Sequence, residues 1–371
     1  MSTTQPFEIF LAAPPGLETT LAEEAAEKGF GPTTQHPGGL SFMGGWADVP
    51  RANLELRGAG RVLARIGSFR AFHLAQLDKR SRKFDWAAFL RPDVPLRVDV
   101  TCRKSKIYHA GAAGERIKRA ISETLGAPLD DTAPLRLMAR IEDDLVTFSL
   151  DTSGEPLHRR GYKEAVGKAP MRETLASLFL RECGYDGSEP IVDPMCGSGT
   201  FPIEAAEIAL GLLPGRARHF AFQDMAGYDA SAWEAMRTAA PARETPLRFY
   251  GFDRDAGAVR MATANAARAG VDHITEFTCQ PISALLPPEG PRGLVMVNPP
   301  YGARIGNRKL LFGLYGALGE VLRTQFRGWR VGIVTSDGGL ARATDLPFLP
   351  GGASVAHGGL KITLHRTGVL R

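Results

Sequence analysis

The 371-residue sequence has few cysteines, and its histidines show no metal-ligand pattern. The four cysteines, Cys102, Cys183, Cys196 and Cys279, lie far apart and form no Cys-x-x-Cys pair. This spacing argues against a disulfide framework and a zinc site, and it is typical of a reducing cytoplasm. The eight histidines also lack ligand spacing, so we expect no metal centre.

Long hydrophobic runs are absent as well. No segment approaches the roughly 18 apolar residues of a transmembrane helix, so we expect no membrane span. The N-terminus has no basic segment and Glu8 interrupts its first apolar run, so we expect no signal peptide. With 44% hydrophobic and 23% charged residues, the composition is that of a soluble globular protein, and the length of 371 residues suggests two or three domains.

The net charge of +5 is unevenly distributed along the chain. Residues 1–60 carry 3 basic and 7 acidic side chains, residues 61–119 carry 15 and 5, and residues 120–156 carry 2 and 8. A basic segment between acidic flanks is either a solvated face or a surface for a polyanion such as RNA. The motifs of the C-terminal half favour RNA.

The pattern of expected elements changes near residue 170. Residues 1–60 and 61–155 mix strands and helices without a regular order. Within residues 156–371, helices and strands alternate from about residue 170 onward. Expected strands in this last part are 190–193, 249–253, 274–279, 294–297, 330–335 and 360–366. The alternation predicts an α/β domain with a mostly parallel sheet and helices on both faces.

A glycine-containing loop, residues 193–200, joins the first of these strands to a helix. Gly197 and Gly199 allow a tight turn and close approach of a ligand, and the helix start presents free N–H groups. Pro202 stands where a dinucleotide-binding fold has a small residue. Asp193 suits a ligand with a cationic amino group, such as S-adenosylmethionine, better than a pyrophosphate.

Two further motifs follow the second and fourth strands. Asp253 can accept both ribose hydroxyls of an adenosine, whereas Asp255 fits a helix N-cap better. The segment Asn298–Tyr301 (Asn-Pro-Pro-Tyr) must leave the sheet because two prolines cannot continue its ladder. Alone it is either a strand-terminating turn or part of a ligand site. Together with the glycine loop and Asp253, it favours a ligand site at the carboxyl edge of the sheet.

The motifs at 193–200 and 298–302 resemble those of class I S-adenosylmethionine-dependent RNA guanine-N2 methyltransferases with a THUMP domain, above all those acting on 23S ribosomal RNA. Residues 157–162 and 169–175 match the stretch before the catalytic domain of that family. The resemblance implies a seven-stranded Rossmann-like methyltransferase domain at 156–371, preceded by RNA-binding ferredoxin-like (1–60) and THUMP (61–155) domains. Some members carry a second methyltransferase; because this sequence ends at Arg371, we expect only one.

The resemblance also implies which residues bind the cofactor: Asp193, Pro194, Gly197, Gly199, Thr200, Asp253, Asp255, Gln280 and Asn298. Family members have an acid after the third strand, where it contacts the adenine amino group, but here Pro281 holds that place. Either Gln280 or a main-chain carbonyl replaces the acid, or cofactor affinity is lower than usual.

The catalytic residues we expect are Asn298, Pro299 and Tyr301. If Asn298 Oδ1 and the Pro299 carbonyl each accept one N–H of an exocyclic amine, its lone pair points at the methyl group. Catalysis is then mostly orientation for in-line displacement and needs no metal. Tyr301 would stack on a flipped-out base. Cys196 lies inside the glycine loop and is interpreted as a packed side chain rather than a nucleophile.

We therefore predict an enzyme that methylates the N2 amine of a guanine in 23S ribosomal RNA. A tRNA guanine-N2 methyltransferase of the same architecture is the nearest alternative. A DNA adenine methyltransferase shares Asn-Pro-Pro-Tyr but lacks the THUMP-like part. An RNA-binding or ribosome-assembly factor that has lost activity is a further alternative, which Pro281 keeps open.

Overall fold

The structure, a computed structural model, describes residues 6–164, 171–239, 241–301 and 308–371. Two compact units divide the chain. The first comprises Met1–Ala13, Ala22–Leu157 and Arg218–Ala239, and the second comprises Pro14–Leu21, His158–Ala217 and Ala240–Arg371. The segment Arg218–Ala239 was expected within the methyltransferase domain, but the structure groups it with the N-terminal unit.

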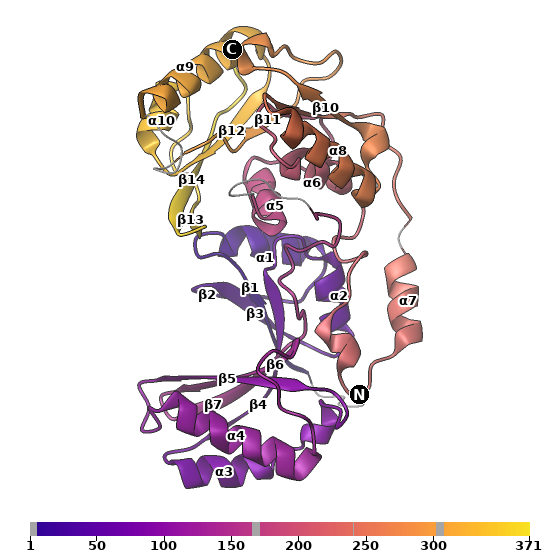
Figure 1. Cartoon of the computed structure of the whole chain (residues 1–371), viewed down its shortest axis with the longest axis vertical. Coiled ribbons are helices and arrows are strands. Elements are labelled where there is room, and N and C mark those ends of the chain that lie inside the picture. Colours follow the sequence, from indigo (N-terminus) through magenta and orange to yellow (C-terminus); the bar gives the residue numbers. More distant parts are fainter. Residues whose placement is uncertain (1–5, 165–170, 240, 302–307) are drawn as a thin grey trace. The chain divides into compact units, whose positions relative to one another are not determined.

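The first unit is built on one seven-stranded sheet in the order β2-β3-β1-β4-β7-β6-β5 (Figure 1). The strands are β1 (Phe7–Ala12), β2 (Thr34–His36), β3 (Gly39–Gly44), β4 (Arg61–Arg70), β5 (Leu96–Arg103), β6 (Leu135–Glu142) and β7 (Leu145–Asp151). The helices are the greater part of α1 (Glu18–Glu27), then α2 (Asp48–Glu55), α3 (Leu74–Arg82), α4 (Ala110–Leu125) and α7 (Ala230–Thr238). Trp233 is buried on α7.

Local sequence explains much of this sheet. The alternation of apolar and polar residues in β6 places Leu135, Leu137 and Ile141 in the core. Asp143 and Asp144, both at positive φ, form the two-residue turn of the β6–β7 hairpin. The predicted boundary at residue 60 falls inside the sheet, because β4 pairs antiparallel with both β1 and β7. A division into domains at that point stays a prediction.

The second unit contains a second seven-stranded sheet, in the order β10-β9-β8-β11-β12-β14-β13. Its strands are β8 (Ile191–Asp193), β9 (Phe249–Asp253), β10 (Thr275–Cys279), β11 (Leu294–Val297), β12 (Arg330–Thr335), β13 (Ser354–His357) and β14 (Leu360–Arg366). Its helices are α5 (Glu173–Glu182), α6 (Thr200–Ala209), α8 (Ala256–Ala269), α9 (Arg308–Gln325) and α10 (Gly338–Ala343).

Pairing in this sheet is parallel from β10 to β12, and β14 runs antiparallel to both β12 and β13. The prediction of a mostly parallel sheet is therefore confirmed. Helices cover both faces of the sheet, because successive side chains of β11 face helices on opposite sides. Val295 and Val297 pack in one core with Leu318 of α9. On the opposite face, a Cβ at Gly332 would meet Met296 and Cys183, the C-cap residue of α5.

None of the described helices is long and apolar enough to cross a membrane. Nor do the described residues bring three His, Cys, Asp or Glu side chains together in an arrangement that could hold a metal ion.

Candidate active site

The predicted ligand-binding motifs follow the carboxyl ends of neighbouring strands. Strand β8, which ends at Asp193, lies between β9 and β11 and is parallel to both. Asp253 ends β9, Gln280 follows β10, and Asn298 follows β11. Because parallel strands end at the same edge, residues up to 105 positions apart in the chain reach one site.

The glycine loop after β8 has two glycines with different roles. Gly199, at φ +85°, is closely packed: a Cβ there would lie 3.0 Å from Ala262 Cβ and 3.1 Å from the Phe277 ring. Gly197, at φ +52°, would meet nothing within 4 Å. Gly199 therefore permits packing of the loop against its own domain, whereas Gly197 leaves backbone open to a ligand.

Asp253 holds this loop from the neighbouring strand. Its Oδ2 accepts the amide of Gly197 at 3.0 Å, and its Oδ1 accepts the amide of Asp255 at 3.0 Å. Each carboxylate oxygen has a further lone pair, so both can still accept a ribose hydroxyl.

Asp193 lies buried beneath the loop, with Oδ1 accepting the Met195 amide at 3.0 Å. Burial, with a smaller contribution from the negative charge of Asp253, raises the pKa of this carboxyl well above its usual range. A cationic group placed here would restore its ionised form. Burial also raises the pKa of the Cys196 thiol, which keeps it protonated and fits its interpretation as a packed side chain.

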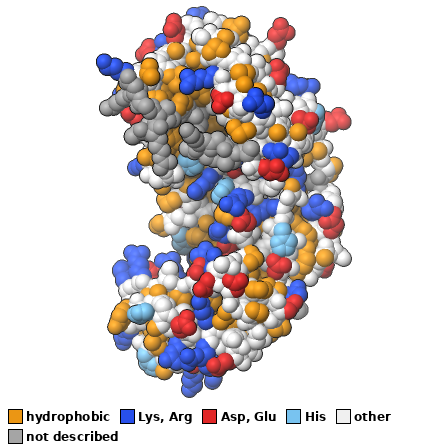
Figure 2. Space-filling view, viewed as in Figure 1, with side chains coloured by type: hydrophobic (Ala, Val, Ile, Leu, Met, Phe, Trp, Pro, Cys, Tyr) orange, Lys and Arg blue, Asp and Glu red, His pale blue; other side chains and the backbone are white. Residues whose placement is uncertain are grey.

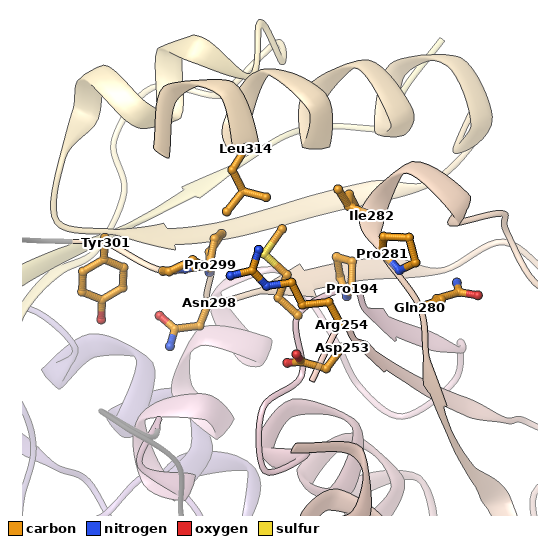
Figure 3. A pocket seen from close by; sticks show the side chains of 12 residues that line it. Pro194, Asp253, Arg254, Gln280, Pro281, Ile282, Asn298, Pro299, Tyr301 and Leu314 are labelled. Atoms are coloured by element: carbon orange, nitrogen blue, oxygen red, sulfur yellow. The ribbon is translucent and has the colours of Figure 1, made fainter. Parts of the chain in front are cut away.

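A cavity of about 370 Å³ opens at this edge of the sheet (Figure 3). Twelve residues line it: Pro194, Met195, Asp253, Arg254, Gln280, Pro281, Ile282, Asn298, Pro299, Pro300, Tyr301 and Leu314. Six of the predicted site residues are among them, including all three predicted catalytic residues. The volume is within the range of pockets that enclose small ligands and cofactors.

Asn298 presents an unused acceptor in this cavity. Its Oδ1 is buried and has no hydrogen-bond partner among the described residues. Figure 3 shows its carboxamide on the same side of the cavity as the Tyr301 ring. Burial raises the pKa of Tyr301, so its hydroxyl is neutral at physiological pH. Gly302, the last residue of the motif at 298–302, lies outside the described residues.

Five predicted cofactor contacts do not line the cavity: Asp193, Gly197, Gly199, Thr200 and Asp255. The last two have other hydrogen-bond partners. Thr200 is buried, and its hydroxyl accepts a hydrogen bond from Lys163 Nζ at 2.8 Å. Asp255 is the N-cap of α8 and accepts the Gly257 amide at 2.7 Å, as its sequence position suggested. A direct contact of either side chain with the cofactor stays a prediction.

The loop after β10 lacks the acid that the family pattern places there. The backbone N–H of Gln280 donates to the Asp253 carbonyl at 2.9 Å, and Pro281 is the N-cap of a short 3-10 helix, Ile282–Ala284. Both residues line the cavity, but the Gln280 side chain points away from the other labelled groups in Figure 3. The replacement of the acid by Gln280 stays a prediction.

Sequence reasoning missed several residues of the cavity wall. Arg254 directly follows a predicted site residue, and in Figure 3 its guanidinium extends over the cavity. Its position in the motif was the only signal that could have identified it. Leu314 reaches the cavity from α9, and Ile282 belongs to the loop after β10. Neither has a local sequence signal, because apolar residues in helices and loops most often serve packing.

These features fit S-adenosylmethionine. Asp253 offers acceptors for a ribose, buried Asp193 offers a carboxyl for a cationic amino group, and Gly197 leaves space for close approach of the backbone. The apolar wall of Pro281, Ile282 and the residues around them suits a flat aromatic ring.

Comparison with known proteins agrees with a site for S-adenosylmethionine. Residues 160–347, slightly more than half of the chain, match the family described as "RMKL-like, methyltransferase domain". The chain belongs to this family. Residues 8–63 of this RMKL-like protein match a second family, described as the RlmL ferredoxin-like domain.

Curated relatives of the RMKL-like chain are named ribosomal RNA large subunit methyltransferase K/L. Those from Syntrophotalea carbinolica and Chromohalobacter salexigens are 35% and 33% identical over 91% and 92% of this chain. In both cases the match covers 50% of the relative. The chain thus spans about half the length of the curated relatives it matches.

Solved structures support the fold along the whole RMKL-like chain. SMU.472, described as a methyltransferase and solved with S-adenosylhomocysteine (SAH), has a TM-score of 0.88 at 26% identity and full coverage of both chains. A Listeria monocytogenes protein, described as a predicted N6-adenine-specific DNA methylase, has a TM-score of 0.87 at 28% identity, covering 98% of this chain and 97% of the other. The fold is that of class I methyltransferases, and S-adenosylmethionine is the cofactor.

Proposed function

We propose that the protein transfers a methyl group from S-adenosylmethionine to the exocyclic N2 amine of a guanine in RNA, and that this RNA is 23S ribosomal RNA. The observation that carries the proposal is the buried Oδ1 of Asn298, which has no hydrogen-bond partner among the described residues, in the cavity of a methyltransferase fold. An unpaired buried acceptor is costly, so it calls for a ligand donor such as an amine N–H.

The residues supply orientation rather than acid–base chemistry. Asn298 Oδ1 and the Pro299 carbonyl accept the two N–H groups of the amine. This takes the nitrogen lone pair out of conjugation with the base and points it toward the bound methyl donor. The donor supplies a methyl group on a sulfonium. As the new N–C bond forms, the C–S bond breaks, and the amine then releases one proton to water. The Tyr301 ring stacks on the base, which offsets the cost of flipping it out of the RNA.

The choice of guanine and of ribosomal RNA rests on resemblance. The relatives' names point to ribosomal RNA of the large subunit. Adenine and guanine amines are held alike by Asn-Pro-Pro-Tyr, and one structural neighbour is described as a predicted adenine-specific DNA methylase. The identity of the base therefore needs a direct test.

We also propose that residues 61–155 form a THUMP-like, RNA-binding domain. Among the described residues, seven of the fifteen basic side chains of residues 61–119 form ion pairs. Lys79, Lys83, Lys104 and Arg119 are exposed and have no such pair. Figure 2 shows Lys and Arg side chains gathered over the end of the first unit that carries α3 and α4 in Figure 1.

Exposed aromatic residues accompany these cations. Tyr108 is 84% exposed just before α4, and Phe72 is 42% exposed before α3. Lys106 Nζ lies 5.0 Å from the centroid of the Phe72 ring. We name Phe72, Lys104, Lys106 and Tyr108 the stacking patch. Aromatic rings interleaved with cations are the means by which proteins hold unpaired nucleotides.

The proposal is tested by incubating the protein with methyl-labelled cofactor and, separately, undermethylated 23S ribosomal RNA, bulk tRNA and DNA. Each product is digested, and the labelled nucleoside is identified. We expect N2-methylguanosine from 23S RNA. The same nucleoside from tRNA alone would show that the substrate is tRNA and not ribosomal RNA. N6-methyladenosine would show that the methylated base is adenine. No transfer to any nucleic acid, with SAH binding also absent, would favour the binding or assembly factor.

A further inference from the structure

Residues 158–164, here called the strap, link the first strand-rich part of the chain to the methyltransferase core. None of them lines the cavity. The proposed chemistry gives them no role, although part of this stretch matches the family pattern. Their polar groups nevertheless reach the glycine loop at several points.

Lys163 makes the most direct contact. Its Nζ donates to Thr200 Oγ1 at 2.8 Å and to the Met171 carbonyl at 3.1 Å, and it forms an ion pair with Glu173 at 2.9 Å. The side chains of Lys163 and Glu173 are only 9% and 3% exposed. An ammonium has three N–H donors, and these three contacts can use all of them. Thr200 is the first residue of α6 and the last of the glycine loop.

A second route runs from the main chain of Tyr162. Its carbonyl accepts Arg268 Nε at 2.7 Å, and the Arg268 guanidinium also donates to Asn265 Oδ1. Asn265 is fully buried and donates from Nδ2 to the Ser198 carbonyl at 3.0 Å. The strap is thus connected to the middle of the glycine loop through α8.

A third anchor is a buried ion pair between the strap and α6. Arg160 Nη2 lies 3.3 Å from Glu204 Oε1, and the two side chains are 2% and 0% exposed. Burying charges costs free energy that their attraction does not always repay, so such pairs are weak evidence for stability alone. Three polar connections to one loop and its helix indicate instead that these contacts fix the position of the loop.

The loop needs such support because Gly197 and Gly199 give its backbone unusual freedom. A flexible loop would lose entropy on closing around a ligand, and a preorganised loop avoids that cost. We propose that the strap holds the glycine loop in its cofactor-binding shape, with Lys163 as its main positioning residue. Thr200 then contributes through Lys163.

The inference rests on the cofactor and not on the proposed RNA substrate, so its test needs no RNA. SAH affinity is measured by calorimetry for the full chain and for Lys163→Met, Thr200→Val and the double variant. Thermal unfolding is followed in parallel. Lys361→Met is the matched control, because Lys361 is exposed on β14 and its side chain forms no hydrogen bond or ion pair with the described residues.

Each single variant is expected to weaken SAH binding about tenfold or more, the scale of a lost charge-assisted hydrogen bond. The double variant should bind SAH hardly worse than Lys163→Met does, because both substitutions remove the same hydrogen bond between Lys163 and Thr200. The control should bind as the unaltered chain does. If Lys163→Met does not fold, Thr200→Val alone decides.

Two results would overturn the inference. One is unchanged SAH affinity in Thr200→Val or in a folded Lys163→Met, even with a lower unfolding temperature, which would leave the strap a purely structural role. The other is additive losses in the double variant, which would mean that Thr200 contacts the cofactor independently of Lys163. Failure of methyl transfer to ribosomal RNA would bear on the substrate and not on this inference.

Discussion

The carboxylate of Asp253 and the amide of Gly197 lie 3.0 Å apart, which joins the end of β9 to the loop that follows β8. The acid can therefore serve two functions in one geometry. It fixes the open glycine of the loop, and, because it lines the cavity, its remaining lone pairs are available to a ribose bound there. Two motifs that are 56 residues apart in the chain act as one unit.

Replacing Asp253 should consequently weaken cofactor binding more than the loss of a ribose contact alone. We expect Asp253→Ala to reduce SAH affinity by about a hundredfold, because charged hydrogen bonds are lost and the loop is released. Asp255→Ala should mainly destabilise α8 through its lost N-cap, with a smaller effect on affinity. Calorimetry and thermal unfolding separate the two. Equal losses of SAH affinity would show that Asp255 also contacts the cofactor.

Asn298→Ala should abolish turnover while leaving RNA affinity nearly unchanged. The buried Oδ1 orients the amine, so its removal should lower kcat by about a hundredfold or more without touching the RNA-binding surface. Single-turnover methylation and RNA binding by filter retention measure the two effects. Gln325→Ala, which removes an exposed amide at the end of α9, is the control. Loss of RNA binding in Asn298→Ala would contradict the role assigned to the side chain.

Much of the catalytic fold was predictable because its strands are short, buried and terminated by distinctive residues. The bounds of β9, β11 and β12 agree with those expected, since Asp253 and the prolines after Asn298 mark where two of these strands end. The short elements β13 and α10 were missed. Four and six residues long, they offer too few positions for a clear period.

The remaining features depend on pairing between distant segments. The continuous sheet across residue 60 follows from β4 pairing with β1 and β7, which no local pattern reveals. Likewise, nothing near Thr200 indicates that Lys163, 37 residues earlier, binds its hydroxyl. Sequence motifs identified the groups that face the ligand, whereas the groups that hold them in place required the structure.

Cofactor binding should be coupled to proton release at Asp193. Burial raises the pKa of this carboxyl in the free protein, and a cationic amino group beside it would lower that pKa. Binding then expels a proton wherever the pH lies between the two values. SAH affinity should therefore rise with pH across that window and level off above the pKa of the free protein.

Calorimetry in buffers of different ionisation enthalpy counts the protons released. Asp193→Asn should abolish the release, and its SAH affinity should lack the pH dependence within that window. Proton release that persists unchanged in this variant would place the titrating group elsewhere.

The ring of Tyr301 should matter more than its hydroxyl. Because Tyr301 is proposed to stack on the flipped base, Tyr301→Phe should retain most of the activity, whereas Tyr301→Ala should raise the KM for RNA and lower kcat, by about tenfold in kcat/KM or more. Methylation kinetics at saturating cofactor measure both variants. A Phe variant as impaired as the Ala variant would show that the hydroxyl, and not the ring, carries the function.

The stacking patch should bind unpaired RNA through two separable forces. Tyr108→Ala removes a ring that is 84% exposed and should weaken binding of single-stranded RNA about tenfold with little change in its salt dependence. Lys106→Ala should weaken binding and also reduce the dependence of log K on log salt by about 0.7, as expected for one lost phosphate contact to a single strand. Arg91→Ala is the control from the same basic segment, because Arg91 is already paired with Asp93. Fluorescence anisotropy at several salt concentrations distinguishes the three variants. Equal behaviour of Tyr108→Ala and Arg91→Ala would show that the patch does not contact RNA.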